Sequence, residues 1–253
     1  MKHGIITLSF MLSGSLLQAA LAATATSSEV PAAVRAAVDN EARPAADRAR
    51  DENRNPASVL AFAGIKAGQK VAELLPSPGY YTRLICHIVG PSGKVYAVEL
   101  KDKDPKRETK ALDTAGCQNV VSSTEVATKL QLAPGNLDVV WTTENYHDLK
   151  DDYWEGGIPD TKAFNAAVFK ALKPGGVYIV EDHAAEVGSG DRDVNTLHRI
   201  DPALVKQEVT SAGFVLLGES DAVHHPEDPH TAKVFTLKGK SDRFLLKFQK
   251  PAK

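Results

Sequence analysis

Short apolar runs alternate with longer amphipathic segments along most of this chain, and this alternation limits the fold more than any single motif. Apolar runs bounded by turn residues predict seven strands, at 70–75, 94–99, 119–123, 137–142, 177–181, 214–217 and 244–248. Helices are expected before or between them, at 43–63, 80–89, 105–115, 161–172 and 202–212. The pattern predicts an α/β fold: a doubly wound, mostly parallel seven-stranded sheet with helices on both faces, in a single domain.

The first 22 residues have the pattern of an export signal. Lys2 precedes an uncharged, mostly apolar run at 4–17, and Ala20-Leu21-Ala22 is a small-x-small cleavage site. The run is shorter than the ~20 residues of a membrane-spanning helix. We therefore predict a signal peptide over 1–22 and no membrane span after its removal; a retained membrane anchor is the alternative. A periplasmic or secreted protein would then have a loose leader over 23–42 and a folded domain over 43–253.

The charge balance bears on possible partners, and the two cysteines bear on a possible disulfide. The chain has 30 Lys and Arg residues, 32 Asp and Glu residues and a formal net charge of −2, which is too close to neutral to indicate a nucleic-acid partner. In an oxidising compartment, Cys86 and Cys117 could form a disulfide. Cys86 could equally be a small buried hydrophobe.

Candidate ligand-binding residues follow the first two predicted strands. In an open α/β sheet, ligands bind outside the carboxyl ends of the strands. Glu73 lies near the end of the first run, and the next segment reaches a helix through Gly79, a residue that lets a ligand approach the backbone. Glu99 ends the second run 20 residues after Gly79, a spacing at which an acidic residue can accept hydrogen bonds from a ribose.

Several segments resemble the class I S-adenosylmethionine-dependent methyltransferases, from about residue 56 to the end of the chain. Lys173-Pro174-Gly175-Gly176 and Ala212-Gly213-Phe214, each before an apolar run, resemble turns that recur in that family. Three segments are similar to those of an exported bacterial branch of predicted methyltransferases. They are Asn145-Tyr146-His147-Asp148, Leu197-His198-Arg199-Ile200-Asp201, and the segment from Ser241-Asp242-Arg243-Phe244 to Pro251. The order and spacing of these segments carry the resemblance, since no single motif is specific.

The resemblance implies a Rossmann-like methyltransferase fold and S-adenosylmethionine as the cofactor. The methyl acceptor, a small molecule or a protein, stays unidentified. The residues assigned to the cofactor are Glu73, Pro76, Ser77, Gly79, Tyr80, Glu99 and Asn145. The family's first loop usually has three alternating glycines, whereas Leu75 and Ser77 stand at the first two of these positions here. Because non-glycine side chains disfavour positive φ, we expect this loop to take a different path or to bind the cofactor differently.

The catalytic candidates are histidines that follow predicted strands at the same edge. We predict His147 or His183 as the general base that takes the acceptor's proton. The residues predicted to bind or orient substrate are Tyr146, Asp182, His198 and Arg199. Arg54, in the helix before the first strand, is a further candidate to lie over the crevice.

No bound metal is predicted, although Asp182, His183 and His198 form an alternative ligand set. The loop that contains His224, His225, Asp228 and His230 is expected to be solvated.

Two other functions stay open. An exported protein with an altered first loop could be a non-catalytic small-molecule-binding or accessory protein on the same fold. A hydrolase or lyase acting through the His and Asp residues is a further interpretation, but the chain has no Gly-x-Ser-x-Gly elbow.

Overall fold

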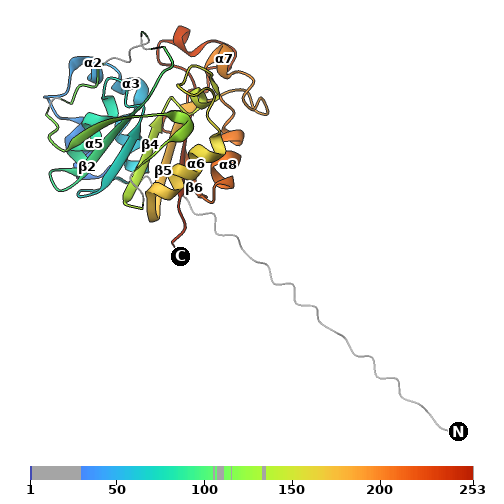
Figure 1. Ribbon diagram of the computed structural model, residues 1–253, viewed down its shortest axis with the longest axis horizontal. Helices are drawn as coiled ribbons and strands as arrows, with labels where there is room; N and C mark the ends of the chain where they lie inside the picture. The colour runs from blue at the N-terminus through green and yellow to red at the C-terminus, as the bar shows by residue number, and fades with distance from the viewer. Residues whose placement is uncertain (2–29, 105, 107–110, 115, 133–134, 253) are drawn as a thin grey trace.

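A computed structural model describes residues 1, 30–104, 106, 111–114, 116–132 and 135–252 (Figure 1). The predicted signal peptide lies outside the described residues, apart from Met1, and so does most of the expected helix at 105–115. Among the described helices, none is both long enough and apolar enough to span a bilayer.

One seven-stranded sheet forms the centre of the protein and confirms the predicted fold class. The strands are β1 (Lys70–Leu74), β2 (Lys94–Leu100), β3 (Val120–Glu125), β4 (Leu137–Thr143), β5 (Leu172–His183), β6 (Val215–Ser220) and β7 (Arg243–Gln249). Their order is β3-β2-β1-β4-β5-β7-β6. The first five strands pair in parallel, and β7 is antiparallel to both of its neighbours.

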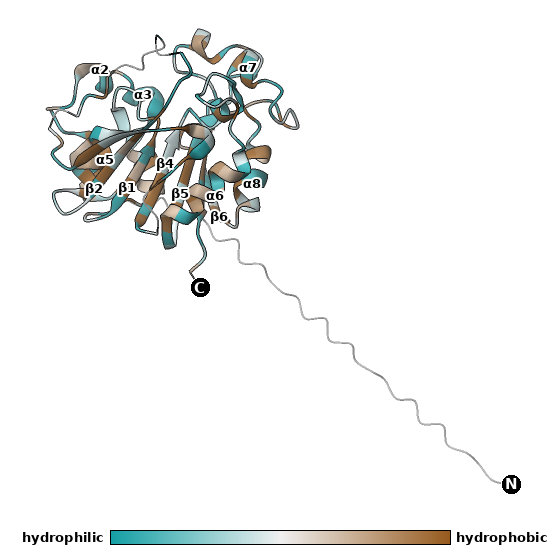
Figure 2. Cartoon of the chain, viewed as in Figure 1, coloured by the Kyte–Doolittle hydropathy of each residue, from teal (hydrophilic) through white to brown (hydrophobic). Residues whose placement is uncertain are grey.

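Apolar residues pack into two core clusters, one on each face of the sheet. Figure 2 shows hydrophobic residues along the strands and along the helices that cover them. One face is covered by α6 (Thr161–Ala171) and α8 (Pro202–Ser211), whose Val168 and Val205 are buried against it. The other is covered by α4 (Pro56–Ala63) and α5 (Tyr80–Val89), with Leu60 and Leu84 buried. The short α7 (Val194–Leu197) lies at the same end of the sheet as α2 (Ala45–Arg48) and α3 (Asp51–Arg54) (Figure 1).

The N-terminal region differs from its prediction. The single helix expected at 43–63 is divided into α2 (Ala45–Arg48), α3 (Asp51–Arg54) and α4. Asn55 ends α3 in the left-handed region at φ 39°, and the following Pro56 starts α4 because it needs no N–H partner there. The described part of the leader is not loose, since α1 (Ala32–Val38) buries Val34 and Ala37 in the core cluster that includes α5.

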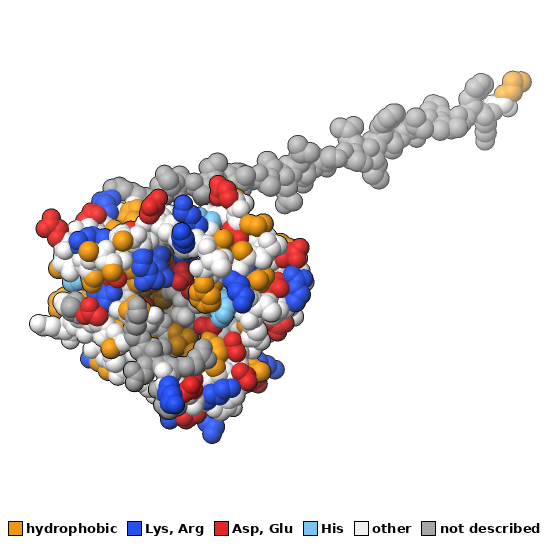
Figure 3. All heavy atoms as spheres, turned by 90° about the horizontal axis from the view of Figure 1, so that it is seen from above, with side chains coloured by type: hydrophobic (Ala, Val, Ile, Leu, Met, Phe, Trp, Pro, Cys, Tyr) orange, Lys and Arg blue, Asp and Glu red, His pale blue; other side chains and the backbone are white. Residues whose placement is uncertain are grey.

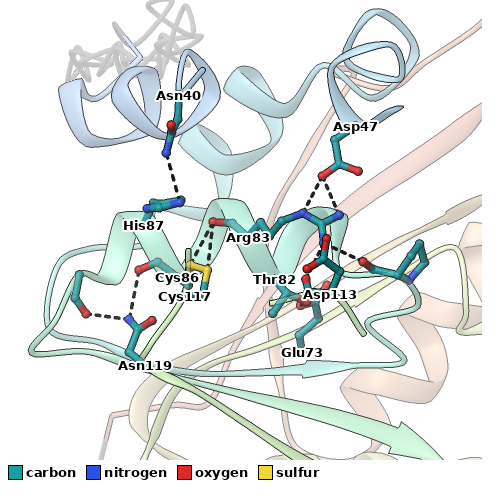
Figure 4. The surroundings of a disulfide bond; sticks show 12 residues. Asn40, Asp47, Glu73, Thr82, Arg83, Cys86, His87, Asp113, Cys117 and Asn119 are labelled. Carbon is teal, nitrogen blue, oxygen red and sulfur yellow. Dashed lines mark hydrogen bonds and ion pairs between the residues drawn. A yellow bond between two sulfur atoms is a disulfide. The ribbon is translucent and has the colours of Figure 1, made fainter. Parts of the chain in front are cut away.

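A disulfide joins Cys86 of α5 to Cys117, just before β3 (Figure 4). Cys86 is therefore disulfide-bonded, as in the first of the two alternatives, and its side chain is also buried. The Asn119 amide donates to the carbonyl oxygens of Cys86 and Gly90 nearby. These contacts fix the segment before β3 against the helix that follows the first loop.

Short 3-10 helices complete the fold. They are η1 (Ala127–Lys129), η2 (His147–Lys150) and η3 (Val234–Leu237). The η2 helix directly follows β4 and its loop, so it carries His147 and Asp148 at the carboxyl edge of the sheet.

Candidate functional site

The first loop, between β1 and α5, contains three residues with positive φ in alternation. Leu75 has φ 53°, Ser77 has φ 51° and Gly79 has φ 92°. The Leu75 N–H donates to the Val98 carbonyl at 2.8 Å, and the Asn145 amide donates to the Leu75 carbonyl at 3.2 Å. The absence of glycine at the first two positions has therefore not kept the backbone out of the left-handed region. This contradicts the different backbone path, the first of our two expectations, whereas a different mode of cofactor binding stays a prediction.

A cavity of about 130 Å3, here called the loop cavity, lies beside this loop. It brings together five of the seven residues assigned to the cofactor: Glu73, Pro76, Ser77, Tyr80 and Asn145. Gly79 and Glu99 do not line it. A Cβ atom on Gly79 would lie 2.7 Å from the Asp113 carbonyl oxygen and 2.8 Å from Arg83 Nη1. Packing within the chain, rather than the approach of a ligand, thus requires glycine at 79.

Two acidic side chains at this edge of the sheet have raised pKa values. Glu73 is buried and accepts a hydrogen bond of 2.5 Å from the Thr82 hydroxyl, and burial raises its pKa to about 8. Burial also raises the pKa of Glu99 to about 7. The Glu99 Oε2 atom is buried without a hydrogen-bond partner among the described residues. A buried acceptor of this kind fits a hydroxyl group supplied by a ligand.

A second cavity of about 430 Å3, here called the cationic cavity, adjoins the first. Its charged lining residues are Arg50, Arg54, Glu144, Lys238 and Arg243, of which Arg50, Arg54 and Glu144 also line the loop cavity. Val234 and Phe235 supply an apolar part of its wall. Figure 3 looks onto this end of the molecule and shows Lys and Arg side chains gathered beside a hollow.

A network of ion pairs joins the two cavities. Glu144 accepts from Arg54 Nη2 at 2.5 Å and from Arg243 Nη1 at 2.8 Å, and the same Arg243 nitrogen lies 3.0 Å from Glu181 Oε1. Burial would raise the pKa of Glu144, but the nearby cations lower it to about 2. For the fully buried Glu181, burial outweighs the attraction of Arg243 and Arg54 and raises the pKa to about 7.

His183 is the predicted base that lines a cavity. Its Nδ1 atom lies 2.9 Å from the Ser241 hydroxyl oxygen, and both residues line the cationic cavity. Burial lowers the pKa of His183 to about 4 in spite of the attraction of Glu144 and Asp182. The imidazole is therefore neutral near pH 7 and able to accept a proton.

His147, the other predicted base, is buried and lines neither cavity. Its Nδ1 lies 2.8 Å from Asp182 Oδ1, its backbone N–H donates to Asp182 Oδ2 at 2.7 Å, and its Nε2 lies 3.2 Å from Asp148 Oδ1. Burial alone would lower its pKa, but the two carboxylates raise it well above the usual value. Its ring centre is 5.9 Å from that of His183 and 5.5 Å from that of His198.

The residues predicted to bind substrate do not line the cavities, and three of them are fully engaged within the protein. Asp182 holds His147, and the Tyr146 hydroxyl donates to Glu208 at 3.0 Å. Each of the three Arg199 nitrogens is bonded, to Asp228 and to the carbonyls of Ala184 and Ala232. Buried polar groups need hydrogen-bond partners, and the partners of these three residues are other groups of the protein. His198 is partly exposed, and its ring lies 4.7 Å from that of Phe235.

The loop at 224–230 exposes His224, Pro226, Glu227 and Pro229, in line with the solvated loop that we expected, and Asp242 holds it in place. Asp242 carboxylate oxygens lie 2.7 Å from His224 Nδ1 and 2.8 Å from His230 Nε2. The Asp242 N–H donates to Asp228, which also pairs with Arg199. The loop is thereby tied to the start of β7.

Of the residues that line the cationic cavity, sequence reasoning had singled out Arg54 and His183. Those that it missed include the charged or hydroxyl side chains of Arg50, Glu144, Lys238, Ser241 and Arg243. Ser241 and Arg243 belong to a segment that carried the family resemblance, and Glu144 follows β4 directly, so these three positions offered a signal. Arg50 lies in a charged stretch of the kind that usually faces solvent, and nothing in the sequence singled out Lys238.

Comparison with known proteins shows the fold. No family model matches the chain. It is similar to the solved S-adenosylmethionine-dependent methyltransferase of Aquifex aeolicus, with a TM-score of 0.57 and 17% identity over 80% of this chain and 93% of that one. The cyclase SpnF is similar to the same degree, with a TM-score of 0.57 and 15% identity over 85% and 86% of the two chains. The chain thus has the fold of the class I S-adenosylmethionine-dependent methyltransferases.

A curated relative also matches. The protein-L-isoaspartate O-methyltransferase of Methanococcus maripaludis strain C5 is 25% identical over 157 residues, which is 62% of this chain. The match spans 65% of that relative's length.

Proposed function

We propose that this chain is an S-adenosylmethionine-dependent methyltransferase whose acceptor binds in the cationic cavity. The observation that carries the proposal is that the loop cavity and the cationic cavity meet at Arg50, Arg54 and Glu144. A donor beside the first loop and an acceptor in the cationic cavity would face each other at this junction. Such positioning supplies much of the rate of an in-line displacement.

The residues beside the first loop fit the cofactor. The unpartnered Glu99 Oε2 suits a ribose hydroxyl, and the left-handed residues of the loop turn the chain into α5 beside Glu73 and Asn145. When bound, S-adenosylmethionine supplies an electrophilic methyl group. The neutral His183 lies where it can take the proton that an alcohol, amine or thiol acceptor loses.

An anionic acceptor suits the charge of the cationic cavity. Arg50, Arg54, Lys238 and Arg243 line it against one carboxylate, Glu144. The curated relative is by name an isoaspartate O-methyltransferase. Carboxylates should therefore be tested first in a screen for acceptors. An ionised carboxylate has no proton to lose, so its methylation would not need His183 as a base.

The second candidate is a non-catalytic binding or accessory protein. The loop cavity, at about 130 Å3, is smaller than the ~300–1,000 Å3 of common small-molecule sites. A nucleoside-sized ligand would have to use the adjoining space as well. The similarity to a cyclase also shows that this fold carries more than one activity.

Calorimetric titration with S-adenosylmethionine and S-adenosylhomocysteine tests the proposal. We expect both to bind, and Glu99→Ala to weaken binding about ten- to a hundredfold by removing charge-assisted hydrogen bonds. Glu155→Ala, on an exposed pair with Lys101, is the matched control and should bind as the wild type does. Absence of binding would exclude the methyltransferase. Binding without turnover across the acceptor screen would favour the accessory protein.

We further propose that the enzyme acts after export, in the periplasm or outside the cell. The signal-like segment ending at Ala22 supports this, and the disulfide agrees with an oxidising compartment. N-terminal sequencing of the protein from its native host should begin at or near Ala23. Intact Met1 in a soluble cytoplasmic fraction would contradict export.

A further inference from the structure

We propose that His147, Asp148 and His198 bind one divalent transition-metal ion of the Zn2+ type. A ring nitrogen of each histidine and a carboxylate oxygen of Asp148 all lie within 4.8 Å of one another. Imidazole nitrogen and carboxylate oxygen are ordinary ligands of Zn2+ and of other first-row divalent ions. The proposal departs from our sequence-based expectation of no bound metal, and it does not depend on methyl transfer.

Asp182 holds His147 as the outer carboxylate of a metal site does. Metal-binding histidines commonly donate their second ring N–H to a carboxylate, which fixes the tautomer and the ring orientation. Here Nδ1 of His147 lies 2.8 Å from Asp182 Oδ1, and Asp182 Oδ2 accepts the His147 backbone N–H. The His147 Nε2 atom is thereby left for the metal, 3.2 Å from the Asp148 carboxylate.

The charge at this cluster also fits a divalent ion. Asp148 and Asp182 both contact His147, and Asp182 is completely buried. A protonated His147 would balance one of the two negative charges, whereas a divalent ion on a neutral His147 would balance both. Unbalanced buried charge is costly, so a metal relieves a cost that a proton relieves only in part.

The cluster lies directly behind the wall of the cationic cavity. The His147 ring is 5.9 Å from the ring of His183, and the His198 ring is 4.7 Å from that of Phe235. His183 and Phe235 both line the cavity. Three protein ligands leave coordination positions for water or for a substrate oxygen, as in catalytic rather than structural zinc sites.

A second group of potential ligands, Cys86, His87 and Cys117, does not compete. Its two sulfur atoms are joined in the disulfide and offer no thiolate. His87 is exposed and remote in sequence from the proposed ligands, so it provides a matched control for histidine removal.

The test is calorimetric titration of Zn2+ into the mature protein after treatment with EDTA, near pH 7.5 in thiol-free buffer. We expect one Zn2+ per chain, at least tenfold weaker binding in His198→Ala, and unchanged binding in His87→Ala. Co2+ should give visible absorption bands in the wild type that are lost in His198→Ala. His198 is partly exposed, so its removal should leave the fold intact.

Asp148→Asn is the second variant, because it keeps the shape of the side chain while removing its charge. It should also weaken Zn2+ binding, with an unchanged circular dichroism spectrum. The proposal is overturned if the wild type takes up no Zn2+ or Co2+. It is equally overturned if His198→Ala and Asp148→Asn bind Zn2+ as tightly as the wild type does.

Discussion

The Nδ1 atom of His183 lies 2.9 Å from the hydroxyl oxygen of Ser241, where β5 and the start of β7 meet at the cationic cavity. No partner for Nε2 of His183 is found among the described residues. If Nδ1–H donates to Ser241, Nε2 carries the free lone pair. Ser241 is then a positioning residue that sets the tautomer of the base.

Replacing His183 should separate two kinds of acceptor. For an acceptor that loses a proton, His183→Ala should lower kcat by ~10²–10⁴-fold. Because burial lowers the pKa of His183 to about 4, the wild-type rate should fall only as pH drops through about 4. The measurement is S-adenosylhomocysteine formation over a pH series that extends from about 9 to about one unit below the His183 pKa of about 4. An unchanged kcat and pH profile in the variant would show that the acceptor is already ionised or that His183 is not the base.

Cofactor binding should tighten as pH rises from about 6 to 8. Glu99 has its pKa raised to about 7 in the free protein, and hydroxyl donors from a ribose favour its ionised form. Binding therefore lowers this pKa and releases a proton. Calorimetry in buffers of different ionisation enthalpy should detect that proton, and Glu99→Gln should reduce the pH dependence. If the affinity of Glu99→Gln for the cofactor depended on pH as strongly as that of the wild type, the ribose would not bind at Glu99. Any residual slope would come from Glu73, whose pKa is raised to about 8.

The first loop should tolerate glycine at 77 and resist a β-branched residue there. Ser77 is exposed and has φ 51°, so its side chain contributes little packing. Ser77→Val should destabilise the protein by ~1–2 kcal/mol, because a β-branched residue disfavours this conformation, and Ser77→Gly should not. Urea unfolding of both variants measures the difference. Equal stability would mean that the loop is not held in the left-handed region.

Removing the Arg243 side chain should strongly destabilise the folded protein. Its side chain is 2% exposed and pairs with the fully buried Glu181, so Arg243→Ala leaves a buried carboxylate without its cation. We expect a loss of ~3–5 kcal/mol in the free energy of unfolding. The exposed pair Lys101–Glu155 is the control, and Lys101→Ala should cost less than ~0.5 kcal/mol. Similar losses in the two variants would mean that Arg243 is not essential to the buried network.

Reduction of the disulfide should destabilise the protein without abolishing its fold. Cys86 and Cys117 are 31 residues apart, which corresponds to ~3–4 kcal/mol in the chain-entropy account. Urea unfolding with and without a reductant should show this loss. In a Cys86→Ala, Cys117→Ala double variant, the reductant should have no effect. A wild-type protein unaffected by a reductant that has opened the bond would refute the estimate.

The strands were predictable because parallel strands buried on both faces read as continuous apolar runs, as at 137–142. The same reasoning placed Glu73 and Asn145 at one edge, since Glu73 lies near the end of β1 and Asn145 follows β4. It could not place Ser241 or Arg243. They stand at the start of an antiparallel strand, and only the direction of β7 brings that start to the carboxyl edge.

Burial was the other limit on sequence reasoning. Arg199 looks like a binding residue because its charge is visible in the sequence, but its partner Asp228 is 29 positions away and is found only by tertiary structure. The break at Asn55, by contrast, could have been predicted, because the residue before a proline disfavours the helical region and Asn tolerates the left-handed one.

The insertion of β7 between β5 and β6 has a consequence for how the protein is made. The strand that fills the gap in the sheet is synthesised after both of its neighbours, and it brings Arg243 to Glu144, Glu181 and the Asn53 carbonyl. Until β7 has docked, the nascent chain has an open sheet edge on each side of the gap and an acidic cluster with too few cations. Assembly of the site is therefore a late event, and a ribosome-stalled chain ending before β7 should be a target for chaperones and proteases rather than a partially active protein.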